Sequence, residues 1–143
     1  MSKKIIGVVG IRQFDNMQLF VAKLEKKLKR FDPDDELEFI TTEENGVAAL
    51  ARQHFTENDT KFSIMKALWD DVGARAGYLR NEALVDASKE LFVFWDGKDV
   101  FLQDLIDYAI RFKRRINIIF IDPTEATTKF TVDAKRVKIP KAK

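Results

Sequence analysis

The fold class is indicated most directly by residues 91–97, Leu-Phe-Val-Phe-Trp-Asp-Gly. Its apolar residues predict a strand that is buried on both faces, and Asp96 and Gly97 predict a turn at its end. In an open α/β sheet, ligands bind where loops leave the carboxyl ends of the strands. The end of this strand is therefore a candidate ligand site.

Other segments of the chain also have the composition of strands. Ile5–Val9 is apolar and rich in β-branched residues and stops at Gly10, which predicts a first and central strand. The remaining strands are expected at Leu37–Thr41, Phe62–Lys66 and Ile116–Ile121.

Helices are predicted between these strands. From Asp15 to Phe31, apolar residues recur with a period near 3.6, and Asp15 or Asn16 is the expected N-cap. A loop containing Trp69 and Gly73 is expected after the third strand. Further helices are expected at about Glu44–Phe55, Arg75–Lys89 and Val100–Phe112.

The alternation of strands and helices predicts an α/β protein with a doubly wound, mainly parallel five-stranded sheet and helices on both faces. No repeat or Gly/Ser linker divides the chain, so residues 1–123 are expected to form one domain. Phe130, Val132 and Ala134 alternate with polar residues. Residues 124–143 are therefore expected to form a C-terminal edge strand or arm and a basic tail.

Composition excludes several classes of protein. The 143 residues include no cysteine, which excludes a disulfide framework and a zinc finger and suits a reducing compartment. The longest apolar runs are far shorter than the roughly 20 residues that cross a bilayer, so we expect a cytoplasmic protein with no membrane association. The formal net charge is +2, but the last nine residues alone carry five Lys and Arg residues and no acid.

The sequence offers no convincing catalytic or metal-binding set. His54 is the only histidine, and without a second histidine or cysteine it is expected to be structural rather than a metal ligand. No Ser-His-Asp or Cys-His set can be assembled around it. The turn from Gly10 to Phe14 has neither the glycine spacing of a dinucleotide fingerprint nor the Gly-Lys-Ser/Thr of a P-loop. We therefore expect no metal and no bound cofactor.

Arg80 is the main candidate for anion binding. It stands beside Asn81 near the start of a predicted helix, where its guanidinium can hold a phosphate or a carboxylate through two hydrogen bonds. The alternative is a surface arginine that pairs with Glu82 or Asp86.

Asp96 and the two tryptophans also have two interpretations each. Asp96 with Gly97 can accept a ribose hydroxyl or simply form the turn before the next helix, and residue type favours the turn. Trp69 and Trp95 can each stack on a base. Trp95 is expected in the core, and Trp69, in a loop, is the better candidate.

These motifs, in this order, resemble the SLOG superfamily, specifically its small YspA/YpsA-related branch, over roughly residues 4–122. The resemblance rests on Gly10-Ile11-Arg12-Gln13-Phe14, Trp69 with Gly73, Ala76-Gly77, Arg80-Asn81 and Phe94-Trp95-Asp96-Gly97. It implies a Rossmann-like sheet whose strand ends bind nucleotides or nucleotide-derived ligands, and it implies a homo-oligomer. The ligand-binding residues expected on this basis are Gly10, Arg12, Gln13, Trp69, Arg80, Asn81, Asp96, Gly97 and Lys98.

The chain departs from the family pattern where that pattern grips phosphate. The family has a glycine pair at the end of the second strand, whereas this chain has Thr-Thr-Glu-Glu-Asn-Gly at residues 41–46, and its carboxylates would repel a phosphate. The family's Gly-Thr pair aligns with Phe101 and Leu102, and Ile11 replaces a usual serine. The Gly-Gly-x-Gly-Thr-x-x-Glu motif of the related Lonely Guy enzymes has no equivalent here.

These departures favour a non-catalytic SLOG-like protein that binds a nucleotide-derived ligand, or a protein partner, through the strand-end pocket. One alternative is a nucleotide N-glycosidase that uses Arg80 for phosphate and Glu43, Glu44 or Asp96 for acid–base chemistry. Another is nucleic-acid binding through the basic C-terminal tail, which is also suggested by a resemblance in fold to the single-stranded-DNA-binding protein DprA.

Overall fold

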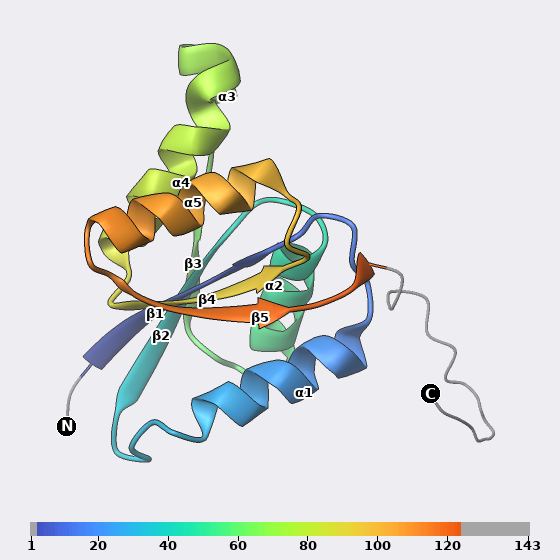
Figure 1. The fold of residues 1–143 in the computed structure, drawn as a ribbon. Coiled ribbons are helices and arrows are strands. Elements are labelled where there is room, and N and C mark those ends of the chain that lie inside the picture. Colours follow the sequence, from blue (N-terminus) through green and yellow to red (C-terminus); the bar gives the residue numbers. More distant parts are fainter. Residues whose placement is uncertain (1–2, 124–143) are drawn as a thin grey trace.

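The computed structural model describes residues 3–123, which form one parallel sheet flanked by helices (Figure 1). The strands are β1 (Lys3–Gly10), β2 (Glu36–Thr42), β3 (Phe62–Met65), β4 (Glu90–Trp95) and β5 (Arg115–Phe120). Every neighbouring pair is parallel, and the order across the sheet is β3-β2-β1-β4-β5. The predicted five-stranded, doubly wound, Rossmann-like fold is confirmed.

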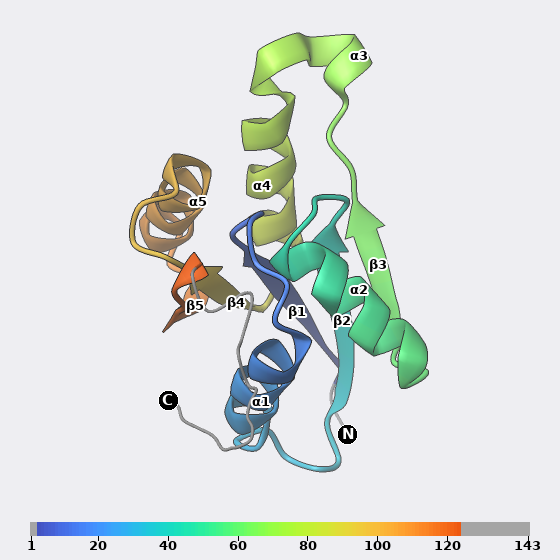
Figure 2. The same ribbon diagram turned by 90° about the vertical axis from the view of Figure 1, so that its right-hand side faces the viewer.

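The helices cover both faces of this sheet. They are α1 (Met17–Leu28), α2 (Val47–Glu57), α3 (Trp69–Val72), α4 (Ala76–Ala87) and α5 (Val100–Arg111). α1 and α2 lie on one face, and α4 and α5 lie on the other (Figure 1). The N-terminal end of α4 extends beyond the sheet, and α3 lies there, joined to α4 by a short 3-10 turn (Figure 2).

The core is centred on β1 and β4, which, like β2, have a neighbouring strand on both sides. Val8, Phe92 and Val93 are completely buried, as the unbroken apolar runs predict for strands covered on both faces. Phe20 from α1 and Leu84 from α4 close the two faces. Burial of each such large side chain contributes about 1.5–3 kcal/mol, so the centre of the sheet is a rigid support for the loops at its ends.

The strand order reverses between β1 and β4, and the carboxyl ends of these strands define the expected ligand crevice. The backbone N–H of Ile11 donates to the carbonyl of Phe94 at 3.0 Å, so the pairing of β1 with β4 continues past Gly10. The N–H of Val47, at the start of α2, donates to the carbonyl of Ile11 at 3.0 Å. The start of α2 is thereby fixed against the end of β1.

Three local features refine the sequence predictions. Asn16 caps α1, because its side chain accepts from the Leu19 N–H at 3.1 Å, but the helix ends at Leu28 rather than near Phe31. The segment from Trp69 forms a short helix where a loop is predicted, and Asp70 and Asp71 in its first turn favour that conformation.

The predicted C-terminal edge strand and basic tail lie outside the described residues. Within residues 3–123, no helix has the length and apolar character needed to cross a bilayer.

Candidate functional site

Arg80 lies in the part of α4 that faces the sheet, and only 2% of its side chain is exposed. Its Nη1 lies 3.1 Å from Oε1 of Glu43, and its Nη2 lies 3.1 Å from Oε2 of Glu44. Its Nε donates to Oδ1 of Asn81 at 3.1 Å. The groups that would grip a phosphate are therefore directed at two carboxylates and an amide of the same chain.

Glu43 and Glu44 are held in place by the segment that follows β2. The second carboxylate oxygen of Glu43 accepts the backbone N–H of Ala67, beyond β3, at 3.1 Å. Nη1 of Arg52 on α2 donates to the backbone carbonyl of Glu44 at 2.9 Å. The Glu43 carboxylate and the Glu44 backbone are thus held by contacts other than those with Arg80, which makes the arrangement part of the fold.

The Glu43 carboxylate is ionised in this environment. Burial works to raise its pKa, but the N–H of Ala67 and the guanidinium of Arg80 favour the charged form and together hold the pKa of Glu43 below its ordinary value. The charge of Arg80 is therefore balanced by at least one full negative charge at neutral pH.

Asn81 is buried with Arg80 and orients it. Only 3% of Asn81 is exposed, and its amide oxygen is the acceptor for the Arg80 Nε. The expected partners Glu82 and Asp86 are not the ones that Arg80 uses; its acidic partners lie 37 and 36 positions earlier in the chain. The alternative of a surface arginine is therefore wrong, and the guanidinium instead pairs with two carboxylates that follow the end of β2.

Gly10 is needed for packing rather than for an opening toward a ligand. A Cβ at this position would lie 2.5 Å from the Cβ of Val47, so the glycine allows α2 to pack on the end of β1.

The turn that follows Gly10 is more accessible, because Arg12 and Gln13 are both exposed. The guanidinium of Arg12 lies 5.5 Å from the centre of the Phe101 ring, in a cation–π contact.

An aromatic cluster lies over Gly77, in the first turn of α4. A Cβ at Gly77 would lie 3.3 Å from Cη2 of Trp69 and 3.6 Å from Cε1 of Phe101, so both rings come close to this backbone. The Tyr78 ring packs on Phe101 with 4.7 Å between centroids. Trp69 remains 51% exposed, so one face of the cluster is available to an apolar or aromatic ligand.

The turn after β4 is built by the side chain of Asp96. Its Oδ1 accepts the N–H groups of Lys98 and Asp99, each at 2.9 Å, and Gly97 has a φ of +82°. This geometry agrees with the turn interpretation, because the aspartate oxygen is used by the backbone. Asp96 and Lys98 also border a cavity of about 440 Å³ beside Phe120 at the end of β5.

The predicted site residues therefore fall into two regions. Arg80 and Asn81 are buried with Glu43 and Glu44, and Arg80 also lies close to Gly77, where the aromatic cluster brings Trp69 and Arg12 together. The turn from Asp96 to Lys98 borders the cavity beside Phe120. Sequence reasoning missed the pairing of Arg80 with the β2 end and the contribution of Tyr78. The acidic pair at residues 43–44, placed where a glycine pair is usual, was the available signal for the first of these.

His54 contacts a carboxylate and an amide. Its Nε2 lies 3.4 Å from Oε2 of Glu25, and its Nδ1 lies 3.2 Å from the amide nitrogen of Asn58. No group of three or more potential ligands for a metal occurs within residues 3–123.

Comparison of the chain with protein families, with curated proteins and with solved structures found no match.

Proposed function

We propose that this protein is a non-catalytic, SLOG-like binding protein that holds a nucleotide-derived ligand at the carboxyl ends of β1 and β4 without gripping a phosphate at Arg80. The observation that carries this proposal is the pairing of Arg80 with Glu43 and Glu44, each at 3.1 Å. A phosphate entering this position would have to displace two anchored carboxylates and would meet their negative charge.

The accessible chemistry around this pair favours a ligand with a flat ring. Trp69 and Phe101 present aromatic surface over Gly77, and the exposed guanidinium of Arg12 lies at its border. Any of the nucleobases can stack on such a surface, because each has a flat aromatic face. A nucleoside, or a nucleotide whose phosphate points away from Arg80, matches these features.

Catalysis of base release is less well supported. A glycosidase needs one carboxylic acid that can donate a proton, but the lowered pKa of Glu43 keeps it ionised. Of the other two candidates, Glu44 is paired with Arg80 at 3.1 Å, and Asp96 is used to hold a turn. Arg80 cannot both bind a substrate phosphate and neutralise Glu43, so the features needed for catalysis oppose one another.

Calorimetry with adenosine, AMP and ADP-ribose tests this proposal. Adenosine and AMP are expected to bind with similar affinity, because the phosphate gains no contact with Arg80. Replacement of Trp69 by alanine is expected to weaken binding about tenfold, since stacking on an aromatic side chain contributes about 1–3 kcal/mol per base. Leu68→Ala is the matched control, because Leu68 is a neighbouring exposed apolar residue.

Either of two results would overturn the proposal. Binding of AMP that is more than about tenfold tighter than that of adenosine would show a functional phosphate grip. If no nucleoside or nucleotide gives a heat of binding or raises the unfolding temperature, a ligand of this class is ruled out. Release of free base during incubation with nucleoside monophosphates would instead support the glycosidase.

A protein contact is the second candidate, and exposed apolar residues near α3 favour it. Leu68 is 60% exposed, Trp69 51% and Leu79 38%. The resemblance to SLOG proteins suggests a second copy of the chain as the partner. Light scattering is expected to give a dimer for the wild type and a monomer for Leu68→Ser/Leu79→Ser, and a monomeric wild type would reject this candidate.

A further inference from the structure

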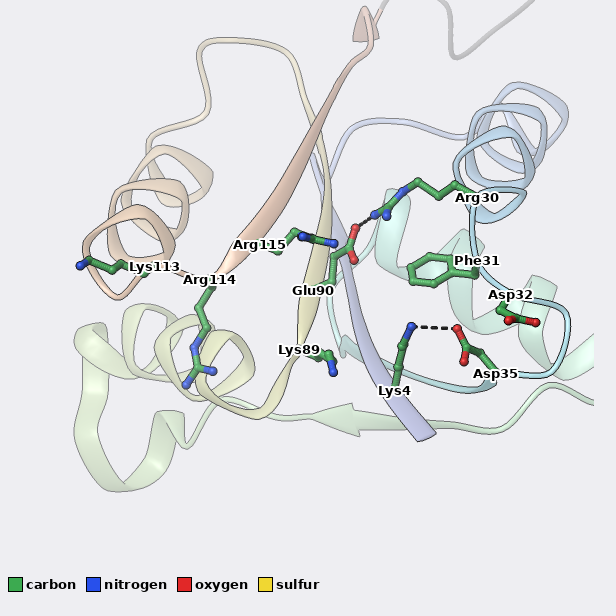
Figure 3. Close-up of a pocket in the computed structure, with 10 residues that line it drawn as sticks. All are labelled: Lys4, Arg30, Phe31, Asp32, Asp35, Lys89, Glu90, Lys113, Arg114 and Arg115. Carbon is green, nitrogen blue, oxygen red and sulfur yellow. Dashed lines mark hydrogen bonds and ion pairs between the residues drawn. The ribbon is translucent and has the colours of Figure 1, made fainter. Parts of the chain in front are cut away.

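A hollow of about 610 Å³ lies at the opposite end of the sheet, where the strands begin (Figure 3). It is bordered by the starts of β1, β4 and β5 and by the turns that follow α1 and α5. Six cationic side chains line it: Lys4, Arg30, Lys89, Lys113, Arg114 and Arg115. We refer to it as the basic hollow.

The positive charge of the basic hollow is a local concentration. Residues 3–123 contain 19 Lys and Arg residues and 21 Asp and Glu residues, so this part of the chain is slightly acidic. The lining nevertheless holds six cations and only three acids, Asp32, Asp35 and Glu90. Cations are therefore gathered here out of proportion to the composition of the domain.

Two of the acids are already paired within the lining. Nζ of Lys4 lies 2.8 Å from Oδ2 of Asp35, and Arg30 forms an ion pair with the buried carboxylate of Glu90 (Figure 3). Asn117 donates a further hydrogen bond to Glu90 at 2.6 Å. These contacts fix two walls of the hollow and leave little acidic charge to oppose an anion.

The remaining cations have no such partners. Lys89, Lys113 and Arg115 form no ion pair within the part of the chain from Lys3 to Pro123. The Nε of Arg114 is buried and has no hydrogen-bond partner there. Arg115 points toward Glu90, whereas Lys113 and Arg114 extend away from it and form an outer rim (Figure 3).

The negative ends of three helices offset only part of the positive charge of the basic hollow. α1, α4 and α5 all end beside the basic hollow, and each helix C-terminus carries a partial charge of about −0.5, or about −1.5 for the three. The lining has three more cations than acids. An excess of about 1.5 positive charges therefore remains, and one phosphate group, with a charge of about −1.5 to −2 at neutral pH, would neutralise it.

We propose that the basic hollow is a binding site for a small molecule that carries at least one phosphate group. The volume lies within the range of about 300–1,000 Å³ that small-molecule sites occupy. Arginine and lysine are the side chains that bind phosphate best, through charge-assisted hydrogen bonds. Lys4, Arg30, Lys89 and Arg115 lie around one hollow (Figure 3), which favours a compact ligand over a nucleic-acid strand.

Calorimetry with tripolyphosphate tests this site independently of the proposed function, because the two sites lie at opposite ends of the sheet. Lys89→Gln/Arg115→Gln removes two unpaired cations and is expected to weaken binding at least about tenfold. Lys23→Gln/Lys26→Gln is the matched control: it removes the same charge from α1, outside the lining, and is expected to change the affinity less than about twofold.

Protection of lysines from acetylation gives a second readout that needs no variant. Tripolyphosphate is expected to protect Lys89 in the wild-type protein and to leave Lys23 and Lys26 reactive. Failure of tripolyphosphate to bind would overturn the proposal, as would equal losses in the two double variants or equal protection of all three lysines. Binding of a single-stranded oligonucleotide without binding of tripolyphosphate would also overturn it, in favour of a nucleic-acid surface.

Discussion

Arg80 and Glu43 form an ion pair of 3.1 Å that joins α4 to the end of β2. Glu43 also accepts the N–H of Ala67 beyond β3, so one carboxylate connects three segments at the carboxyl end of the sheet. The pair has the geometry of an arginine that binds an anion, with the anion supplied by the protein itself. This relationship determines what stability and binding measurements should show.

Replacement of Arg80 by alanine is expected to destabilise the domain by about 2–4 kcal/mol, because breaking a buried pair leaves uncompensated carboxylates. Urea unfolding measures this change. Arg80→Leu combined with Glu43→Gln and Glu44→Gln is expected to recover much of the loss, since no unpaired charge remains. A change below about 0.5 kcal/mol in Arg80→Ala, the range of ordinary surface substitutions, would contradict a structural role for the pair.

Glu43→Gln/Glu44→Gln is expected to create phosphate affinity that the wild type lacks. The charge of Arg80 is then no longer neutralised, so AMP should bind about tenfold more tightly than adenosine. Glu36→Gln/Glu57→Gln is the matched control, because these exposed acids lie away from Arg80 and the net charge changes equally. A similar gain in the control would mean that overall charge, rather than the guanidinium of Arg80, attracts the phosphate.

The lowered pKa of Glu43 predicts how stability depends on pH. A carboxyl whose pKa is lower in the folded than in the unfolded state stabilises the fold above its ordinary pKa, and this contribution is lost as pH falls through the folded value. The wild type should therefore exceed Glu43→Gln in unfolding free energy at neutral pH, and the difference should shrink as pH falls below the ordinary value of 4.5. Urea titrations of both proteins across this range measure it, and a difference independent of pH would contradict the ionised pair.

The strands could be predicted because their burial is visible in local composition. Ile5–Val9 and Leu91–Trp95 are unbroken apolar runs, and both are central in the sheet. The Asn16 cap and the Asp96 turn were also predictable, because each depends on hydrogen bonds that span at most three residues. Local chemistry thus determines the framework of the fold.

The arrangement around Arg80 could not be predicted in the same way. Spacing along a helix suggests partners three or four residues away, whereas Glu43 is 37 positions from Arg80 and reaches it only through the packing of β2 beside β1. The adjacent acids at residues 43–44 are visible in the sequence, but their contact with Arg80 depends on the tertiary structure. Trp69 was predicted as a loop residue that can stack on a base, yet its position over Gly77 depends on the short helix α3.

The end of α5 gives a last prediction, because Lys113 occupies a position that glycine favours. Its φ is +58°. The N–H of Lys113 donates to the carbonyl of Ile110 at 3.1 Å, and the N–H of Arg114 donates to the carbonyl of Ala109 at 2.9 Å. These bonds form a Schellman motif with a lysine in the left-handed position.

Lys113→Gly is expected to raise the unfolding free energy by about 0.5–1 kcal/mol, measured by urea unfolding, whereas Lys113→Ala keeps the strain and should not stabilise. Asp59→Gly, at the equivalent position of α2 with φ of +52°, should act in the same direction. Equal stabilities of the glycine and alanine variants at residue 113 would show that backbone strain is absent there and that loss of the lysine charge governs the change.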